Sequence, residues 1–186
     1  MISEISTLPN GIRVITSSRP EIESVSLGIW VNTGAAYEKP QLNGISHFLE
    51  HMVFKGTKTR NAFEISDQFE DVGGQSNAYT AREFTAFYAK MLKADTELAI
   101  DILADLVTNP TFPIEELVKE REVVVQEIKQ GIDTPDDIIF DFVQEKAFPN
   151  QALGRTILGP AEKVRSFGQT ELQGYLSSNY GGENMV

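Results

Sequence analysis

The residues most suited to chemistry are His47, Glu50 and His51, which fall within five positions. On a helix, histidines four residues apart lie on one face with their Cβ atoms about 5–6 Å apart, close enough to bind one metal ion. Neutral imidazoles suit zinc. Glu50 projects to the same side, and a carboxylate that does not bind the metal can take a proton from zinc-bound water. The pattern His-x-x-Glu-His, which inverts the commoner His-Glu-x-x-His, therefore predicts a hydrolase.

Two surface histidines on an ordinary amphipathic helix are the alternative interpretation. The chain has two histidines in all, and both fall in this turn with the glutamate between them, so that alternative is weak. Steps of 100° per residue place the apolar side chains on one face and the three polar ones on the other. The apolar stripe is Leu42, Ile45, Phe48, Leu49, Met52 and Val53. We expect the core and the metal site to lie on opposite sides of this helix.

The third metal ligand must be a carboxylate, because the chain has no cysteine and no further histidine and a catalytic zinc usually takes three protein ligands. A helix predicted over residues 111–130 offers Glu120 and Glu127 at the border of its apolar stripe, and spacing alone does not choose between them. Arg121 falls within the stripe, so we expect it to hold a buried carboxylate. The stripe residues are Ile114, Leu117, Val118, Val124, Val125 and Ile128.

Alternating apolar residues predict strands in the first half of the chain, and helical periodicity dominates after Asp95. A hairpin is expected over 7–17 around Pro9-Asn10-Gly11, and the metal-site helix is expected to end at Gly56. Strands followed by helices predict an α+β fold, a mostly antiparallel sheet packed against a layer of helices. The remaining expected strands are 25–31, 75–80 and 84–92, and the remaining helices are 61–72, one around 98–106, 134–148 and two shorter ones after 160.

Composition limits the classes of function. With 186 residues, 41% of them hydrophobic and 23% charged, the chain suits one globular domain with a substantial core. The net charge of −11 argues against nucleic acid and is compatible with attracting basic peptides. No apolar run reaches membrane-spanning length, and we expect no leader peptide before the first strand. We expect a cytoplasmic protein of a bacterium, or a protein of the mitochondrial matrix if a transit peptide was removed.

The sequence resembles the pitrilysin/insulinase family of zinc metallopeptidases, in the branch of mitochondrial processing peptidase β subunits and their bacterial relatives. The motif 47–51 is followed by the similar Met52-Val53-Phe54-Lys55-Gly56-Thr57. Glu127 lies 127 − 51 = 76 residues beyond the second histidine, where the family places its third ligand. Residues 73–80, Gly-Gly-Gln-Ser-Asn-Ala-Tyr-Thr, resemble the edge strand on which the family pairs substrate backbone.

The resemblance implies roles for seven residues. His47, His51 and Glu127 would hold Zn²⁺, Glu50 would be the general base, and Glu120 would be a carboxylate behind the ligands. Asn77 and Ala78 would contact the substrate. The implied activity is that of a zinc endopeptidase that cleaves extended peptides or targeting presequences through water activated by Glu50.

Family members build the site from two or more homologous domains, whereas this chain resembles the first alone. We expect residues 1–186 to be a single N-terminal catalytic domain, a fragment that lacks the second domain. Its partners would be the peptide and a C-terminal homologous domain or partner subunit. The isolated fragment would be inactive and could self-associate. The alternative is a non-catalytic scaffold or partner subunit of the same fold, and a zinc-stabilised binding module would need a fourth ligand that the chain does not offer.

Overall fold

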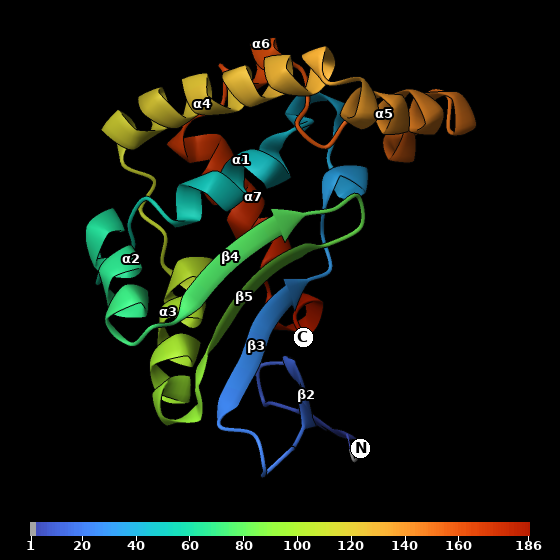
Figure 1. Cartoon of the computed structure of the whole chain (residues 1–186). Helices are drawn as coiled ribbons and strands as arrows, with labels where there is room; N and C mark the ends of the chain where they lie inside the picture. The colour runs from blue at the N-terminus through green and yellow to red at the C-terminus, as the bar shows by residue number, and fades with distance from the viewer. Residues whose placement is uncertain (1–2) are drawn as a thin grey trace.

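The computed structural model describes residues 3–186 and contains a three-stranded antiparallel sheet in the order β3–β5–β4 (Figure 1). The strands are β3 (Ser24–Val31), β4 (Gln75–Thr80) and β5 (Thr85–Leu92). The central strand β5 pairs with both neighbours. Its Thr85 lies opposite Val31 of β3 on one side and opposite Thr80 of β4 on the other. Strand β4 has β5 as its one neighbour in this sheet, so its other edge is open.

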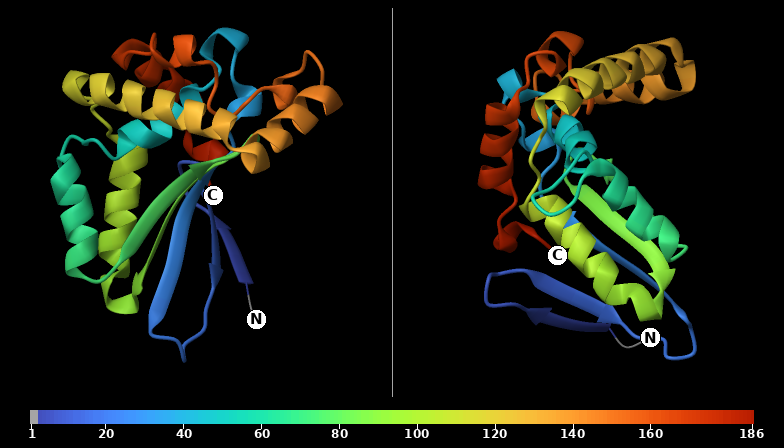
Figure 2. Two further views of the ribbon diagram at one scale, coloured as in Figure 1. Left: turned by 45° about the horizontal axis from the view of Figure 1, so that its top comes forward. Right: turned by 90° about the vertical axis from the view of Figure 1, so that its left-hand side faces the viewer.

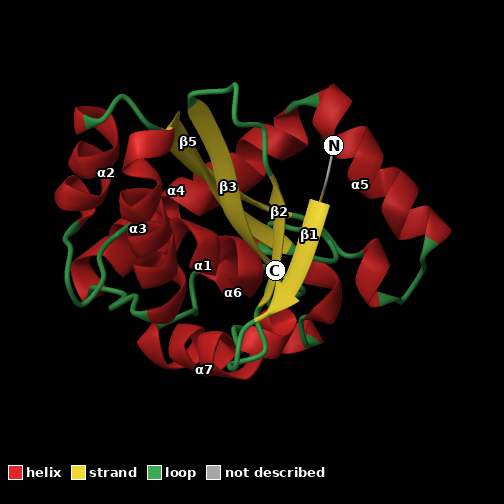
Figure 3. Ribbon diagram, turned by 90° about the horizontal axis from the view of Figure 1, so that it is seen from below, coloured by secondary structure: helices red, strands yellow, loops and turns green. Residues whose placement is uncertain are grey.

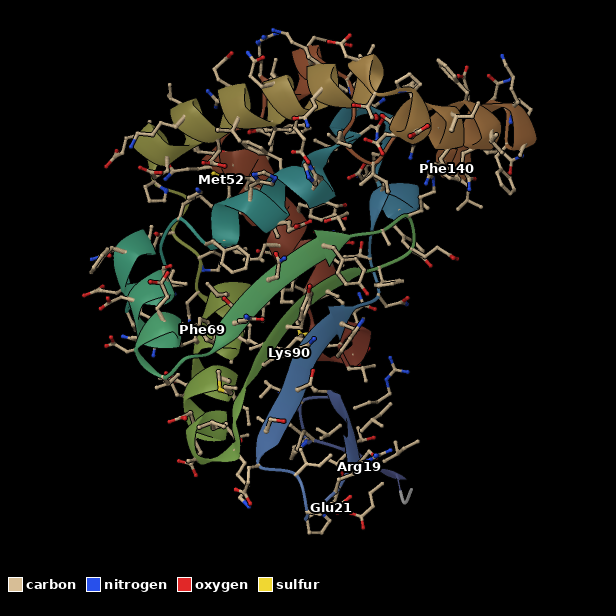
Figure 4. The ribbon with its side chains drawn as sticks, viewed as in Figure 1. Arg19, Glu21, Met52, Phe69, Lys90 and Phe140 are labelled. Carbon is tan, nitrogen blue, oxygen red and sulfur yellow. The ribbon has the colours of Figure 1, made fainter. Side chains whose placement is uncertain are left out.

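Helices cover one face of this sheet, and Figure 1 looks onto the face that carries none. Phe87, Ala89 and Met91 of β5 point into the core beneath the helices, while Lys90 points to the uncovered face (Figure 4). This alternation of apolar and polar side chains is what a half-buried strand requires. The helices are α1 (Ile45–Val53), α2 (Ala62–Asp71), α3 (Thr96–Thr108), α4 (Ile114–Asp133), α5 (Pro135–Ala147), α6 (Ala161–Val164) and α7 (Gln169–Asn179), with short 3₁₀ turns at Ala35–Tyr37, Pro40–Leu42, Lys93–Asp95, Ala152–Gly154 and Gly182–Asn184.

Strands β1 (Ser3–Thr7) and β2 (Arg13–Ser17) form a separate two-stranded sheet (Figure 3). The predicted hairpin is confirmed, and Gly11 occupies its turn with a φ of +92° that favours glycine. Both faces of the hairpin are largely exposed. Its main-chain link to the rest of the fold is the Arg13 N–H, which donates to the Met185 carbonyl, while Val186 pairs with Trp30 of β3.

The predicted α+β class is confirmed, and the structure corrects several details. The metal-site helix ends at Val53 rather than Gly56, because the chain turns at Phe54 and the Lys55 N–H returns to the Met52 carbonyl. The expected apolar stripe of α4 is wrong at Ile114 and Val118, which are 64% and 56% exposed. Leu117, Glu120, Val124 and Val125 make its buried side. Among the described helices, none is long and apolar enough to cross a membrane.

Candidate metal centre

Helix α1 separates the core from the chemistry, as its sequence pattern predicts. Its apolar side chains are fully buried between the sheet and the neighbouring helices, whereas His51 and Glu50 remain partly accessible. The ring centroids of His47 and His51 lie 4.7 Å apart, the spacing expected for residues one turn apart on a helix. The buried apolar residues of α1 are Ile45, Phe48, Leu49, Met52 and Val53.

Helix α4 lies across α1 (Figure 2). It brings Glu127 to the two histidines. The Glu127 Oε2 atom is 3.6 Å from His47 Nε2 and 3.5 Å from His51 Nε2. One ligand atom from each of these three residues lies within 4.8 Å of the others. The fold thus closes the gap of 76 residues between the histidine motif and Glu127.

Glu120 occupies a different position, behind His51. Its Oε2 atom is 3.0 Å from His51 Nδ1, and its Oε1 atom is 2.8 Å from Lys55 Nζ. Glu120 is buried, with 6% of its surface exposed. The two glutamates therefore contact opposite nitrogens of one imidazole, a distinction that their spacing along α4 did not reveal. The role of Lys55 was not predicted from the sequence, because Lys55 lies just beyond the end of α1, four residues after His51.

The charges around His51 set its protonation. An acceptor at Nδ1 favours the tautomer that carries its hydrogen there, which leaves the Nε2 lone pair facing Glu127. Burial lowers the pKa of His51, but Glu127 and Glu120 outweigh it and raise that pKa above its ordinary value. His47 and then His51 hold the pKa of Glu127 well below its ordinary value, against the opposing effect of burial. Glu127 is thus an ionised carboxylate at neutral pH.

This set of residues fits zinc. Two imidazole nitrogens and one carboxylate oxygen are a known ligand combination for catalytic zinc, which keeps a further position open. The side chain of Glu127 is 45% exposed, so the space between the three groups can be reached from outside. The nitrogen of His47 that faces the Glu127 carboxylate is Nε2. Its Nδ1 atom is buried without a hydrogen-bond partner within residues 3–186.

Glu50 lies outside the three-residue group and is held by the sheet. Thr80, the last residue of β4, donates a hydrogen bond from Oγ1 to Glu50 Oε2 over 2.6 Å. Asn77 and Ala78 on the same strand were predicted site residues, but Thr80 was not, because its partner is 30 residues away along the chain.

A buried carboxylate anchors the beginning of α1. Glu38 Oε2 accepts hydrogen bonds of 2.8 Å from the Gly44 N–H and 2.9 Å from Asn43 Nδ2, and Oε1 accepts one of 2.8 Å from the Ser46 N–H. These N–H groups belong to the first turn of a helix, where a negative charge is favourable. The role of Glu38 could not be predicted from the sequence, because its partners follow it by five to eight residues in no standard capping pattern.

Arg121 does not hold a buried carboxylate, contrary to the prediction. Its Nε atom donates to the main-chain carbonyl of Phe167 over 2.9 Å, and its Nη2 atom donates to the same oxygen. The guanidinium therefore ties α4 to the segment before α7. A carbonyl serves as well as a carboxylate here because Arg121 is only partly buried and keeps access to water.

The predicted substrate contacts lie on the open edge of β4. Ala78 is buried at its side chain, so it could meet a peptide through its main chain alone. Its N–H is already bonded, at 2.8 Å, to the side-chain oxygen of Asn77.

Beside the open edge of β4 a cavity of about 440 Å³ opens between α2 and the sheet, with Phe69 at its wall (Figure 4). It is lined by Ser66, Phe69, Glu70, Gly74, Gln75, Ser76, Asn77, Tyr88 and Lys90.

Comparisons with known proteins show the family of this chain. The family model described as insulinase (peptidase family M16) matches residues 13–161. An uncharacterized zinc protease of Bacillus subtilis, YmxG, is 44% identical over 97% of this chain and 44% of its own length. A probable mitochondrial-processing peptidase subunit beta of Arabidopsis thaliana is 40% identical over 99% of this chain and 35% of its own. The chain belongs to the insulinase family, peptidase family M16, and spans less than half the length of these relatives.

Solved structures share the fold at lower identity. A protease from Helicobacter pylori superimposes with a TM-score of 0.93 at 23% identity, covering all of this chain and 45% of its own. A peptidase M16 inactive domain from Pseudomonas fluorescens gives a TM-score of 0.92 at 15% identity, with the same coverage. Since one of these neighbours is described as inactive, the fold by itself does not decide activity.

Proposed function

We propose that the full-length protein is a zinc-dependent endopeptidase that cleaves extended peptides, with targeting presequences as one candidate class. His47, His51 and Glu127 hold the metal in this proposal, and Glu50 is the general base. The observation that carries it is the approach of both histidine Nε2 atoms to one Glu127 oxygen, at 3.6 and 3.5 Å. The zinc protease and processing peptidase names of its relatives support the same assignment.

Bound zinc would supply a Lewis acid that acidifies water and polarises a peptide carbonyl. The chain's own contribution is the proton transfer. Glu50 has one oxygen engaged by Thr80, so Oε1 is the atom that accepts the proton of the attacking water and returns it to the leaving nitrogen. Glu120 and Lys55 keep the His51 ring oriented from behind.

The peptide would add to the open edge of β4 as a further strand. Main-chain hydrogen bonds give such docking its affinity without demanding one sequence. The Asn77 side-chain oxygen accepts a hydrogen bond from the Ala78 N–H. The Asn77 side chain must therefore rotate away before a peptide carbonyl can accept that hydrogen bond. The net charge of −11 favours approach of basic peptides.

The rest of the site is proposed to come from elsewhere. We propose that a C-terminal homologous domain or a partner subunit supplies the opposite wall of the substrate chamber. Positioning by two walls is worth several kcal/mol in catalysis, so residues 1–186 alone would bind zinc and turn over little. Helix α5 exposes apolar side chains, including Phe140 (Figure 4), and such surfaces promote self-association. The exposed residues on α5 are Ile139, Phe140, Phe142 and Val143.

A non-catalytic scaffold or partner subunit is the alternative function. A scaffold needs neither a base nor a ligand set. The chain keeps Glu50 held by Thr80 beside the group His47, His51 and Glu127, which favours the enzyme.

The test is cleavage of an extended basic peptide by the zinc-loaded full-length protein. We expect Glu50→Gln to keep its zinc and to lose at least the roughly 10²–10⁴-fold typical of general acid–base catalysis. Glu97→Gln, an exposed glutamate of α3, is the matched control and should retain activity. A wild-type protein that holds zinc but cleaves no peptide would favour the scaffold, and full activity in Glu50→Gln would remove the assigned base.

A further inference from the structure

The hydrogen bond between Thr80 and Glu50 joins two parts of the site that the sequence treats separately. Thr80 belongs to β4, the strand whose open edge carries Asn77 and Ala78. Glu50 belongs to α1, one residue before His51. The Thr80 Oγ1 atom lies 2.6 Å from Glu50 Oε2. The docking strand therefore touches the proposed base directly.

A glutamate needs such a contact to act as an aligned base. Its side chain has several rotatable bonds, and fixing them costs up to about 2 kcal/mol of rotamer freedom. Both residues are only half-buried, so packing alone does not hold the carboxylate. The Thr80 hydroxyl supplies a donor to one oxygen before any substrate arrives, which is the preorganisation that proton transfer requires.

The position of Thr80 in the sheet makes it a rigid support. Strand β4 pairs with β5 along its whole length, and Thr80 lies opposite Thr85 at the last position of the ladder. The Ala81 N–H then bonds to the Phe84 carbonyl and closes the turn. A peptide that adds to the other edge of β4 would be held by the same strand that holds Glu50.

We propose that Thr80 is a positioning residue, whose hydroxyl fixes the Glu50 carboxylate in register with a peptide docked on β4. This inference rests on the proposed function, since it concerns the geometry of the same base. It assigns Thr80 no contact with the metal and no proton of its own to transfer. The Thr80 hydroxyl therefore affects the rate of the chemical step and not the binding of substrate or zinc.

Two substitutions of Thr80 separate the hydroxyl from the shape of the side chain. Thr80→Val keeps the branched shape that suits a strand and removes the donor. Hydrogen bonds to charged groups are the stronger ones, so we expect kcat to fall about 10- to 100-fold. KM and the zinc dissociation constant should stay within about twofold of the wild type, because neither docking nor the ligands change. Thr80→Ser keeps the donor and should restore kcat to within about threefold of the wild type.

A double-mutant cycle with Glu50→Gln distinguishes positioning from general stability. If Thr80 acts through Glu50, then Thr80→Val should change the residual rate of Glu50→Gln by less than about twofold. A crystal structure of zinc-loaded Thr80→Val should place the Glu50 carboxylate in more than one rotamer. An active wild type together with an undiminished kcat in Thr80→Val, or an equal loss in both backgrounds, would overturn the inference. An inactive wild type would overturn the proposed function and this inference with it.

Discussion

Lys55 and Glu120 form an ion pair directly behind the candidate metal centre, with Lys55 Nζ 2.8 Å from Glu120 Oε1. The other oxygen of Glu120 meets His51 Nδ1. A buried carboxylate is costly without a partner, so Lys55 stabilises the residue that orients His51. The orientation of the His51 ring thus depends on Lys55 through Glu120.

Removing the ammonium should destabilise the protein. We expect Lys55→Met to lower the free energy of unfolding by about 1–3 kcal/mol, because Glu120 would lose a charged partner while staying buried. Chemical denaturation of the zinc-free protein measures this change. Lys119→Met removes the exposed pair with Glu116 and should have a clearly smaller effect, because water screens an exposed ion pair. Equal effects of the two substitutions would contradict the role given to Lys55.

The two glutamates of α4 should differ in their effect on the metal. Glu127→Gln removes the carboxylate that faces both Nε2 atoms, and we expect stoichiometric zinc to be lost. Glu120→Gln should retain one zinc with an affinity about 10–100-fold weaker, as is usual for a residue that orients a ligand. Metal analysis and competition with a chelator measure both quantities. The assignment is reversed if Glu120→Gln loses the metal and Glu127→Gln keeps it.

Glu38, which anchors the beginning of α1, should influence both the stability of the protein and its affinity for zinc. Glu38→Gln keeps the size of the side chain but has one acceptor oxygen, so it leaves a donor of the first turn unpaired. We expect a loss of about 1–3 kcal/mol in unfolding free energy, together with weaker zinc binding because His47 lies in that turn. Glu64→Gln weakens the exposed cap of α2 and should leave zinc affinity unchanged. Unaltered zinc affinity in Glu38→Gln would separate the anchor from the metal centre.

Asp105 should make the free energy of unfolding depend on pH. Burial raises its pKa, but donors from Thr57, Thr59, Asn109 and Arg60 outweigh burial and lower the pKa below the ordinary 3.8. A carboxylate with a lowered folded pKa stabilises the fold above its unfolded pKa, and this stabilisation is lost as the pH falls through the folded pKa.

We therefore expect Asp105→Asn to destabilise the protein by about 1–3 kcal/mol at pH 7. The difference from the wild type should shrink once the pH falls below 3.8. Denaturation at a series of pH values checks the trend. Asp101→Asn, an exposed partner of the same Arg60, should have a smaller effect. A difference that stays constant down to pH 2 would rule out the linkage.

Local sequence patterns predicted the strands and helices well, because side chains return to the same face every two residues in a strand and about every 3.6 residues in a helix. The helix that carries His47 and His51 and the helix that carries Glu127 were predicted in this way. The stripe of α4 failed at Ile114 and Val118, since periodicity identifies an apolar face without telling which turns reach the body of the protein.

The residues that support the site were harder to predict, because each acts through a tertiary contact. Glu120 and Glu127 share one border of α4, and it is the orientation of α4 over α1 that sends them to opposite nitrogens of His51. Thr80 meets Glu50 across the packing of a strand on a helix. Arg121 donates to a main-chain carbonyl, whereas the sequence predicted that it would bind a carboxylate. Spacing along one element carries no information about such partners.

The pairing of the strands sets how quickly different parts of the chain exchange amide hydrogens with solvent. Strand β5 is bonded on both sides and largely buried. Among the described residues, β1 and β2 have only each other as neighbouring strands, with the Arg13 N–H bonded to the Met185 carbonyl. Exchange through local opening should therefore be fast in the hairpin and slowest in β5, whose protons wait for global unfolding. Deuterium uptake would then report the hairpin and the core that supports α1 as two separate cooperative units.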